Sequence, residues 1–472
     1  MKTILNSVLL TATALCCTAL LSCNKFDDVQ DGDVNYFGKN KTFAEEINGQ
    51  LYWFIPESNG SQNVLVTWNR INYNSIVDYI RYTSKYTGAV DVPSTVTHNG
   101  VTYTVTGADD NAFYYCTDIT SLKLQEGMTH WGEHTWFYSP YRNVMTKVTE
   151  IYLPSTLSDL PTIPAYYFRG NTALVNCHIP NVTEIGEGAF WGCTKLTTLN
   201  LPASATETEG IYIPASVTKI GANAFALCNS RAYLTVEAGN TVYTSQDGSG
   251  VECNAIIERS SGKLILGCKN TTLPSGVTGY SSFAFSGVYT TKNTTLQVPA
   301  SVTTVEPGAF AGCTGLSDFS VAADNNAYDS RDNCNAIIET SSNKLVAGCN
   351  YTTIPESVRS IGNYAFYGFS MSTMTLSEGV EAIGEYAFAN CSSMKTLTLP
   401  STMKNIGNNA FNGTGKLVAI YVNATTPPAI ANATTFSNAS KCKVYVPAGT
   451  KEAYEKDTFW GAFSSIIEIT EE

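Results

Sequence analysis

Residues 130–134 read HWGEH, which places two histidines and a glutamate at the spacing of a zinc-protease signature. That chemistry needs a helix, because one helical face must present both imidazoles to the metal while the glutamate acts as general base. A glycine lies inside the pentapeptide, and no apolar helical period surrounds it. The stretch also aligns with a repeated phrase described below, so we predict a degenerate repeat here and no metal site.

The sequence carries none of the common signatures of catalysis or cofactor binding. It lacks the Gly-x-Ser-x-Gly elbow, the phosphate-binding loop and the dinucleotide fingerprint. With four histidines in 472 residues, a Ser-His-Asp site has few possible bases. We therefore predict no catalytic residues, no metal and no cofactor.

Two segments share a pair of cysteines at the same spacing, CNAIIERSSGKLILGC (253–268) and CNAIIETSSNKLVAGC (334–349). Each is typical of a strand, a polar turn and a second strand. In the register that places Glu258 opposite Lys263, the two cysteines of each segment face one another, where a disulfide is sterically possible. A shift of one residue would instead leave two reduced pairs. The candidate disulfides are Cys253–Cys268 and Cys334–Cys349.

Five further cysteines share one position of a repeated phrase, three residues after a phenylalanine or its equivalent. They are Cys116, Cys193, Cys228, Cys313 and Cys391. Other copies of the phrase place Val288, Phe369 or Thr414 there, and exchange with apolar residues indicates a packing position. We expect free thiols in the core and not metal ligands, since no Cys-x-x-Cys pair is present.

The N-terminus is typical of a secretory signal peptide, with Lys2 before a long apolar run over residues 1–22. The run ends in LLSC, which resembles the bacterial lipobox, and this resemblance implies that Cys23 is the lipidated first residue of the mature chain. An uncleaved membrane anchor is the alternative, because the run is nearly long enough to span a bilayer. Lysine and aspartates close behind Cys23 are similar to the surface-export signal of some Gram-negative lipoproteins. We expect an outer-membrane lipoprotein exposed at the surface, with residues 23–45 as a flexible tether.

Composition excludes one large class of partner. The net charge is −12 and charged residues make up only 14% of the chain, whereas nucleic-acid binding requires a basic stripe. We therefore expect no nucleic-acid partner. The hydrophobic content of 43% is enough for a packed core.

A six-residue phrase, Ile-Gly-x-x-Ala-Phe, recurs along the chain. Strict copies lie at 185–190, 220–225, 361–366, 383–388 and 406–411. Each is followed by an alternating apolar phrase, such as Leu196-x-x-Leu199-x-Leu201, which predicts a short strand with one buried face. One strand and one turn in 22 or 23 residues cannot bury their own apolar side chains, but stacked copies can. The repeat length lies within the leucine-rich-repeat range.

The segment LTLPSTMKNIGNNAFNGTGKL (397–417) resembles the BspA-type leucine-rich repeat. The resemblance implies a β-rich solenoid, which we place at 106–423, and a C-terminal capping segment at 424–472 with a short helix at Lys451–Lys456. Residues 46–105 alternate and are rich in aromatic residues, so we predict a small β-rich N-terminal domain there.

Repeat architecture without a catalytic constellation predicts a non-enzymatic cell-surface lipoprotein that presents a scaffold for protein binding or adhesion. Relatives of the BspA type are associated with adhesion to host proteins, which the resemblance implies. The alternative is a glycan-binding or nutrient-capture lipoprotein, favoured if Tyr and Trp side chains form a concave aromatic platform. An enzyme would need polar groups that converge in one pocket.

Overall fold

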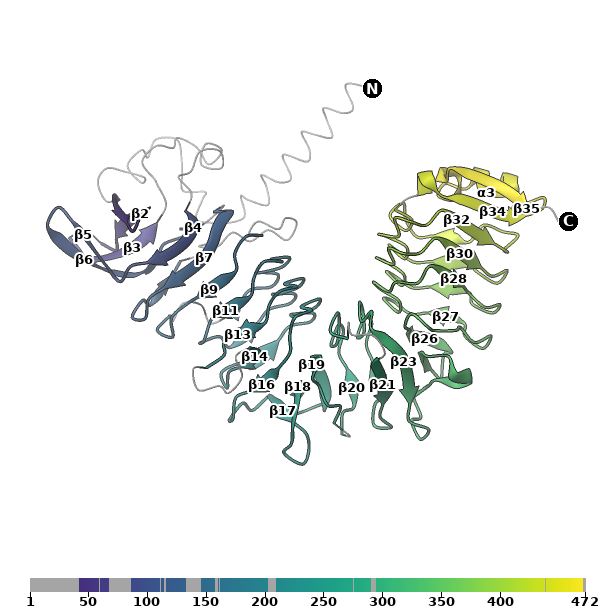
Figure 1. Cartoon of the computed structure of the whole chain (residues 1–472), viewed down its shortest axis with the longest axis horizontal. Helices are drawn as coiled ribbons and strands as arrows, with labels where there is room; N and C mark the ends of the chain where they lie inside the picture. Colours follow the sequence, from purple (N-terminus) through teal and green to yellow (C-terminus); the bar gives the residue numbers. More distant parts are fainter. Residues whose placement is uncertain are drawn as a thin grey trace, which may run out of the picture.

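The computed structural model describes residues 42–58, 60–67, 86–110, 112–113, 116–132, 146–157, 160, 162–202, 209–274, 276–289, 294–437 and 439–469. These residues form an arc of strands and turns with almost no helix (Figure 1). No helix in these ranges is both long enough and apolar enough to cross a membrane. The predicted signal peptide (1–22), Cys23 and most of the tether lie outside the described residues.

The N-terminal residues form a separate sheet that continues into the repeats. Its strands run in the order β1 (Phe43–Ile47), β2 (Gln50–Pro56), β3 (Asn63–Thr67), β6 (Val101–Ala108) and β5 (Thr95–His98), and β6 also pairs in parallel with β8 (His130–Trp131). The expected domain boundaries after residues 45 and 105 therefore fall inside β1 and β6. The first strand of the repeat sheet is β4 (Thr87–Val92), earlier than expected.

Each repeat contributes one strand to a parallel sheet along one side of the arc. The first group is β4, β7 (Asp118–Leu124), β9 (Glu150–Tyr152), β11 (Asn176–His178), β13 (Thr198–Leu199), β14 (Gly210–Ile213) and β16 (Leu234–Val236). The second is β21 (Thr294–Val298) and β23 (Leu316–Val321), and the third is β28 (Thr373–Thr375), β30 (Thr396–Leu399), β32 (Ala419–Val422), β34 (Lys443–Pro447) and β35 (Ser465–Ile469). We call these the long strands.

A two-residue strand opens most of the repeated turns and forms a second parallel sheet. Its groups are β10 (Thr162–Ile163), β12 (Glu184–Ile185) and β15 (Lys219–Ile220); β20 (Gly279–Tyr280) and β22 (Thr304–Val305); and β27 (Ser360–Ile361), β29 (Ala382–Ile383), β31 (Asn405–Ile406) and β33 (Ala429–Ile430). We call these the short strands. One coil is then a short strand, a turn and a long strand, and the predicted mostly β repeat fold is confirmed.

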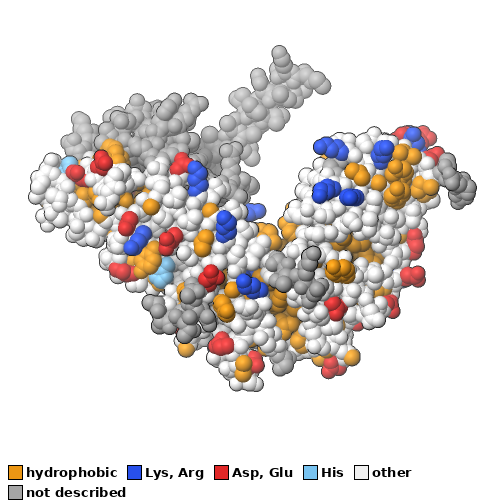
Figure 2. Space-filling view, viewed as in Figure 1, with side chains coloured by type: hydrophobic (Ala, Val, Ile, Leu, Met, Phe, Trp, Pro, Cys, Tyr) orange, Lys and Arg blue, Asp and Glu red, His pale blue; other side chains and the backbone are white. Residues whose placement is uncertain are grey.

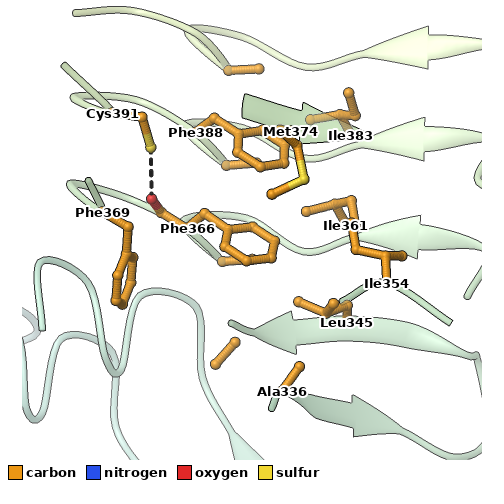
Figure 3. Packing of buried hydrophobic residues seen from close by; sticks show 14 of the residues in the cluster. Ala336, Leu345, Ile354, Ile361, Phe366, Phe369, Met374, Ile383, Phe388 and Cys391 are labelled. Carbon is orange, nitrogen blue, oxygen red and sulfur yellow. Dashed lines mark hydrogen bonds between the residues drawn. The ribbon is translucent and has the colours of Figure 1, made fainter. Parts of the chain in front are cut away.

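The phenylalanine of each turn points into the interior and stacks on its counterparts in neighbouring coils. Phe388 stacks on Phe366 at a centroid distance of 5.0 Å (Figure 3). Phe411 stacks on its other face at 5.2 Å, and the planes are within 4° of parallel in both pairs. Phe190 and Phe225 repeat the arrangement at 5.3 Å. All five rings are buried, as the sequence predicted for this position. Because each ring needs a neighbour above and below, burial is a property of the stack.

The cysteine three residues after the phenylalanine joins one coil to the previous one. The Cys391 thiol donates to the carbonyl oxygen of Phe366 at 3.0 Å (Figure 3), and Cys193 makes the same bond to Phe168 at 3.0 Å. Cys228 and Cys313 repeat the pattern. A small polarisable side chain with a weak donor suits this buried position, and the prediction of free core thiols is confirmed.

Two three-stranded insertions interrupt the array. They are β17 (Tyr243–Gln246), β18 (Glu252–Glu258) and β19 (Lys263–Gly267), and β24 (Tyr328–Asp329), β25 (Ile337–Glu339) and β26 (Lys344–Ala347), the latter with a 3-10 turn at η1 (Arg331–Asn333). In each, the last strand pairs in parallel with the short strand of the next coil, β19 with β20 and β26 with β27. The insertions therefore occupy the short-strand side of the arc.

The register of these hairpins departs from the expected one. Ile257 lies opposite Leu264, as predicted, but a bulge follows and Ala255 lies opposite Gly267. The second hairpin has the same shift. The displacement of one residue moves each pair of cysteines out of cross-strand alignment.

The predicted disulfide pairing is therefore corrected. Cys253 and Cys268 are free thiols that donate to different carbonyl oxygens, of Ser245 at 2.9 Å and of Ala232 at 2.9 Å. The same applies to the other pair, Cys334 and Cys349, which are also free and buried.

A buried arginine, unexpected from the sequence, joins the first insertion to the coils on either side. Arg231 takes the position held by leucine in other coils, six residues after the turn phenylalanine, and is fully buried. Its guanidinium donates to the carbonyl oxygens of Gly267 (2.6 Å), Cys228 (2.6 Å) and Ala284 (3.1 Å). Burial without a carboxylate lowers the pKa of Arg231, and the carbonyl oxygens compensate the cost of desolvation.

The C-terminal end contains the predicted helix α3 (Lys451–Lys456), together with η2 (Ala439–Lys441) and η3 (Trp460–Ala462). Tyr454 and Trp460 are buried and donate to the carbonyl oxygens of Ala424 and Pro428, both at 2.7 Å. These contacts close the last coil with a bulky aromatic layer.

The stack predicts a large cost for removing one ring. Phe388→Ala is expected to lower the free energy of unfolding by about 3–5 kcal/mol, because it leaves a cavity between two stacked rings. Chemical denaturation followed by circular dichroism measures this. The control is Val418→Ala, a side chain that is 54% exposed and should change stability by about 0.5 kcal/mol or less. Equal effects of the two substitutions would contradict a stacked core.

The thiols should be unreactive in the folded protein. Burial raises the pKa of Cys228 and of Cys391 to about 12, so little thiolate is present at pH 8. Iodoacetamide should leave the eleven described cysteines unmodified in the native chain and label all of them in denaturant without a reductant. Mass spectrometry detects the labels. Labelling of Cys253 and Cys268 only after reduction would show that the two residues form a disulfide.

Candidate binding surface on the inner edge of the arc

The insertions determine which edge of the array lies inside the bend. At the short strands they separate neighbouring coils, but at the turns the same coils remain in contact. Leu227 N donates to Ser286 Oγ at 2.9 Å across the first insertion, and Gly312 N donates to Tyr367 O at 2.7 Å across the second. Coils that are spread on one side and joined on the other must bend toward the joined side. The turns therefore line the inner edge of the arc (Figure 1).

Several of these turns present an aromatic residue in the left-handed backbone region. Tyr166, Phe283, Tyr364 and Tyr386, each two residues before the turn phenylalanine, have φ between 52° and 60°. Bulky residues rarely adopt this conformation, which is strained and clusters at functional sites. Because aromatic residues recur at this position, we infer that the contacts of their rings offset the conformational strain.

Two of these rings each pack against a glycine of the following coil. A Cβ at Gly188 would lie 2.5 Å from the ring of Tyr166, and a Cβ at Gly308 would lie 3.0 Å from the ring of Phe283. The rings therefore lie along the direction of stacking and extend over the next coil. Glycine is needed at both positions for this close approach and for its own positive φ.

Six aromatic side chains and one arginine form a continuous line. We call it the inner strip: Tyr166, Arg169, Trp191, Phe283, Tyr364, Tyr367 and Tyr386. Arg169 lies over Tyr166 and Trp191 at 5.5 and 5.3 Å, as in cation–π pairs. Trp191 then contacts Phe283 at 5.4 Å and Phe283 contacts Tyr364 at 5.0 Å. Tyr364 stacks on Tyr386 at 5.0 Å.

Small residues in the intervening coils allow rings from alternate coils to meet. Ala226 and Ala311 are buried beneath the strip with Phe283, whereas Trp191, Tyr364 and Tyr367 are partly exposed around them. Hydrophobic side chains gather in the hollow where the two arms of the arc meet (Figure 2). The strip is thus a half-buried aromatic ridge on the inside of the bend.

The strip also contains groups that can form hydrogen bonds. Tyr367 Oη accepts a hydrogen bond from Asn390 Nδ2 at 2.7 Å. Burial raises the pKa of Tyr364 to about 12, so its hydroxyl remains neutral and can donate or accept a hydrogen bond at physiological pH. Aromatic faces with neutral hydroxyls and one cation are suited to noncovalent binding.

A small cavity of about 190 Å³ adjoins the strip at the first insertion. It lies between the turn at 220–226 and residues 281–283, with Ile265 and Leu266 of β19 and the carboxylate of Glu306 in its lining. It is smaller than typical small-molecule sites, which measure about 300–1,000 Å³. It can accommodate one small group of a ligand that lies on Phe283.

Residues 130–132 of the HWGEH stretch begin a degenerate coil, as predicted. His130 and Trp131 form β8, a strand, and the rest of the motif beyond Gly132 lies outside the described residues. A Cβ at Gly132 would lie 2.4 Å from Asp110 N, the same close contact that Gly221 makes with Glu187 N. Where the structure describes the chain, it holds no group of three or more potential metal ligands.

Outward-facing side chains of the long strands form aromatic pairs of their own, apart from the inner strip. Tyr152 stacks on His178 at 4.6 Å, and Tyr421 stacks on Tyr445 at 4.7 Å. The strip itself was missed because its residues occupy the variable positions of the repeated phrase. The available signal was the recurrence of aromatic side chains at positions where a solvated turn favours small polar residues.

The repeats of the chain match a known family of repeat proteins. The model of the BspA type leucine rich repeat region matches six copies over residues 93–152, 141–247, 255–342 and 332–443. The chain therefore belongs to the BspA-type leucine-rich-repeat family. No match was found among curated proteins.

Solved structures of bacterial leucine-rich-repeat proteins are similar to the chain. A leucine rich cell surface protein from Faecalibacterium prausnitzii is 21% identical, with 92% of this chain and 97% of the other covered and a TM-score of 0.42. A leucine-rich repeat protein from Bacteroides ovatus is 19% identical, with 92% and 99% covered and a TM-score of 0.32. Similarity at this level does not indicate which ligand the chain binds.

The close packing of the Phe283 ring against Gly308 predicts that a larger residue at position 308 destabilises the fold. Gly308→Ala forces Cβ against the ring of Phe283 and places alanine at φ 74°, so a loss of about 1–2 kcal/mol in the free energy of unfolding is expected. Thermal or chemical denaturation measures it. Gly276→Ala is the matched control, because nothing lies within 4 Å of its Cβ position. A neutral Gly308→Ala would show that the ring is not held there.

Proposed function

We propose that the protein is a non-enzymatic binding scaffold, a repeat solenoid attached to the outer membrane through lipid on Cys23 and displayed at the cell surface. Its family contains surface proteins, and a similar solved structure is described as a cell surface protein. The observation that carries the proposal is the inner strip, in which seven residues from several coils form one partly exposed line with Phe283 buried within it. A stacked array supplies such extended concave surfaces without a catalytic pocket.

A glycan is the ligand class that the shape of the strip supports best. From Trp191 to Tyr386 its rings follow one another at centroid distances of 5.0 to 5.4 Å and form a narrow line, as an extended polymer requires. A sugar ring can place its apolar face on Tyr or Trp while its hydroxyls bond to neighbouring amides such as Asn390. Nutrient capture is the corresponding role.

A host or cell-surface protein is the second candidate. Trp, Tyr and Arg carry most of the binding energy in protein interfaces, and Trp191, Tyr364 and Arg169 are of these types. A stable protein interface buries about 1,200–2,000 Å² in total, however, so it would have to extend well beyond the strip.

A binding screen with paired variants tests the proposal. The chain from residue 23 onward, with Cys23→Ser, is screened against immobilised glycans and host matrix proteins. For any ligand found, Trp191→Ala combined with Tyr364→Ala should weaken binding at least about tenfold, the loss typical of interface anchors.

Tyr152→Ala with His178→Ala is the matched control, since it removes the stacked pair on the outward face of the long strands. It should leave affinity within about twofold, a change below 0.5 kcal/mol. Equal losses in the two double variants, or loss only in the control, would place the binding surface elsewhere.

A further inference from the structure

Basic residues concentrate in the segments that follow the turn phenylalanines, although the whole chain is acidic and the turns themselves hold Glu187, Glu306 and Glu385. The net charge is −12. Within the described residues, the seven positions after each turn phenylalanine hold one acidic residue, Asp118. The basic residues at these positions are Arg169, Lys195, Arg231, Lys395, Lys416, Lys441 and Lys443. Apart from the buried Arg231, these side chains are exposed, so the segments after the turns carry a local positive charge.

Four of these lysines lie together at the C-terminal arm, and we call them the lysine cluster: Lys395, Lys416, Lys441 and Lys443. Val418 N donates to Lys395 O at 3.0 Å, and Lys443 N donates to Val418 O at 2.9 Å, so these three residues follow one another on successive coils. Adjacent strands are about 4.8 Å apart, which places Lys395 and Lys443 about 10 Å apart along the array. Lys416 and Lys441 directly precede the buried Leu417 and Cys442.

The cluster has no counter-charge within the described part of the chain. All four lysines are exposed and form no ion pair with a described residue. Several lysines elsewhere do: Lys404 lies 2.8 Å from Glu381 and Lys219 lies 3.1 Å from Glu184. On the C-terminal arm, basic side chains gather on the side toward the other arm, and acidic side chains lie at the outer edge (Figure 2). Like charges held together without partners repel one another until an anion neutralises them.

The cluster begins where the inner strip ends. Tyr386 is the last ring of the strip and precedes Phe388 by two residues, and Lys395 follows Phe388 by seven. One ligand that runs along the inner edge therefore passes from aromatic rings to ammonium groups. Lysine binds carboxylate and sulfate as a mobile point charge, with no demand for a fixed bidentate geometry.

We infer that the ligand of the inner edge is an anionic linear glycan, whose uncharged ring faces lie on the strip and whose carboxylate or sulfate groups are bound by the lysine cluster. This inference rests on the proposed function and narrows it. A single-stranded nucleic acid is the competing anionic polymer, and the oligo-dT probe below decides between the two.

Binding of defined polymers to the chain from residue 23 with Cys23→Ser tests the inference. The probes are polygalacturonate for carboxylate, heparin for sulfate, dextran as a neutral glycan and oligo-dT as a nucleic acid. At least one of the two anionic glycans should bind at least tenfold tighter than dextran and oligo-dT. Its affinity should fall as salt rises from about 50 to 200 mM, because exposed charges are screened over about 10 Å.

Replacement of the cluster, Lys395→Gln, Lys416→Gln, Lys441→Gln and Lys443→Gln together, should weaken that binding at least tenfold and flatten its salt dependence. The matched control replaces Lys219, Lys404, Lys451 and Lys456 by glutamine, which changes net charge equally at lysines that already have carboxylate partners. It should stay within twofold of the parent. Circular dichroism and melting temperature verify that both variants fold.

Four outcomes overturn the inference: no binding of either anionic glycan, equal loss in the two quadruple variants, tighter binding of dextran, or tighter binding of oligo-dT. The proposed function is decided separately. If Trp191→Ala with Tyr364→Ala abolishes binding of a neutral glycan or a protein that the cluster variant still binds, the scaffold role stands and the anionic ligand does not.

Discussion

The column of stacked phenylalanine side chains is the interaction on which the rest of the structure depends. Phe388 is buried only because Phe366 and Phe411 cover its two faces, and the same holds along each regular stretch of coils. A single coil of 22 or 23 residues has no interior of its own, so its stability comes from its neighbours. The thiol of Cys391 adds a hydrogen bond between coils at the same level.

The two insertions convert this regular column into a bent one. Each insertion supplies a tyrosine hydroxyl that accepts a hydrogen bond from a short strand whose next neighbour is missing. Ile220 N donates to Tyr243 Oη and Val305 N donates to Tyr328 Oη, both at 2.8 Å. The interrupted strand edges are thereby satisfied, and the turns remain joined on the other side. Curvature, the crowding of rings on the inner edge and the facing of the two arms all follow from that asymmetry (Figure 1).

Much of the fold was predictable because repetition reveals which positions are internal. The phenylalanine and cysteine positions, the mostly β repeat and the helix at Lys451–Lys456 could all be read from residue types and spacing. The hairpin bulge could not, because residues 253–268 fit two registers equally well and packing of the insertion selects one. Arg231 breaks the apolar pattern, and only the convergence of carbonyl oxygens explains it. The inner strip depends on curvature, which no single repeat encodes.

Small-angle X-ray scattering of the chain from residue 23 tests most directly whether stacked coils and two insertions together make a bent array. A bent array gives a distance distribution with a long-range shoulder from the two arms and a maximum dimension shorter than that of the same coils stacked in a line. A rod-like profile, with the maximum dimension of a straight stack, would contradict it, and would remove the inner edge with it.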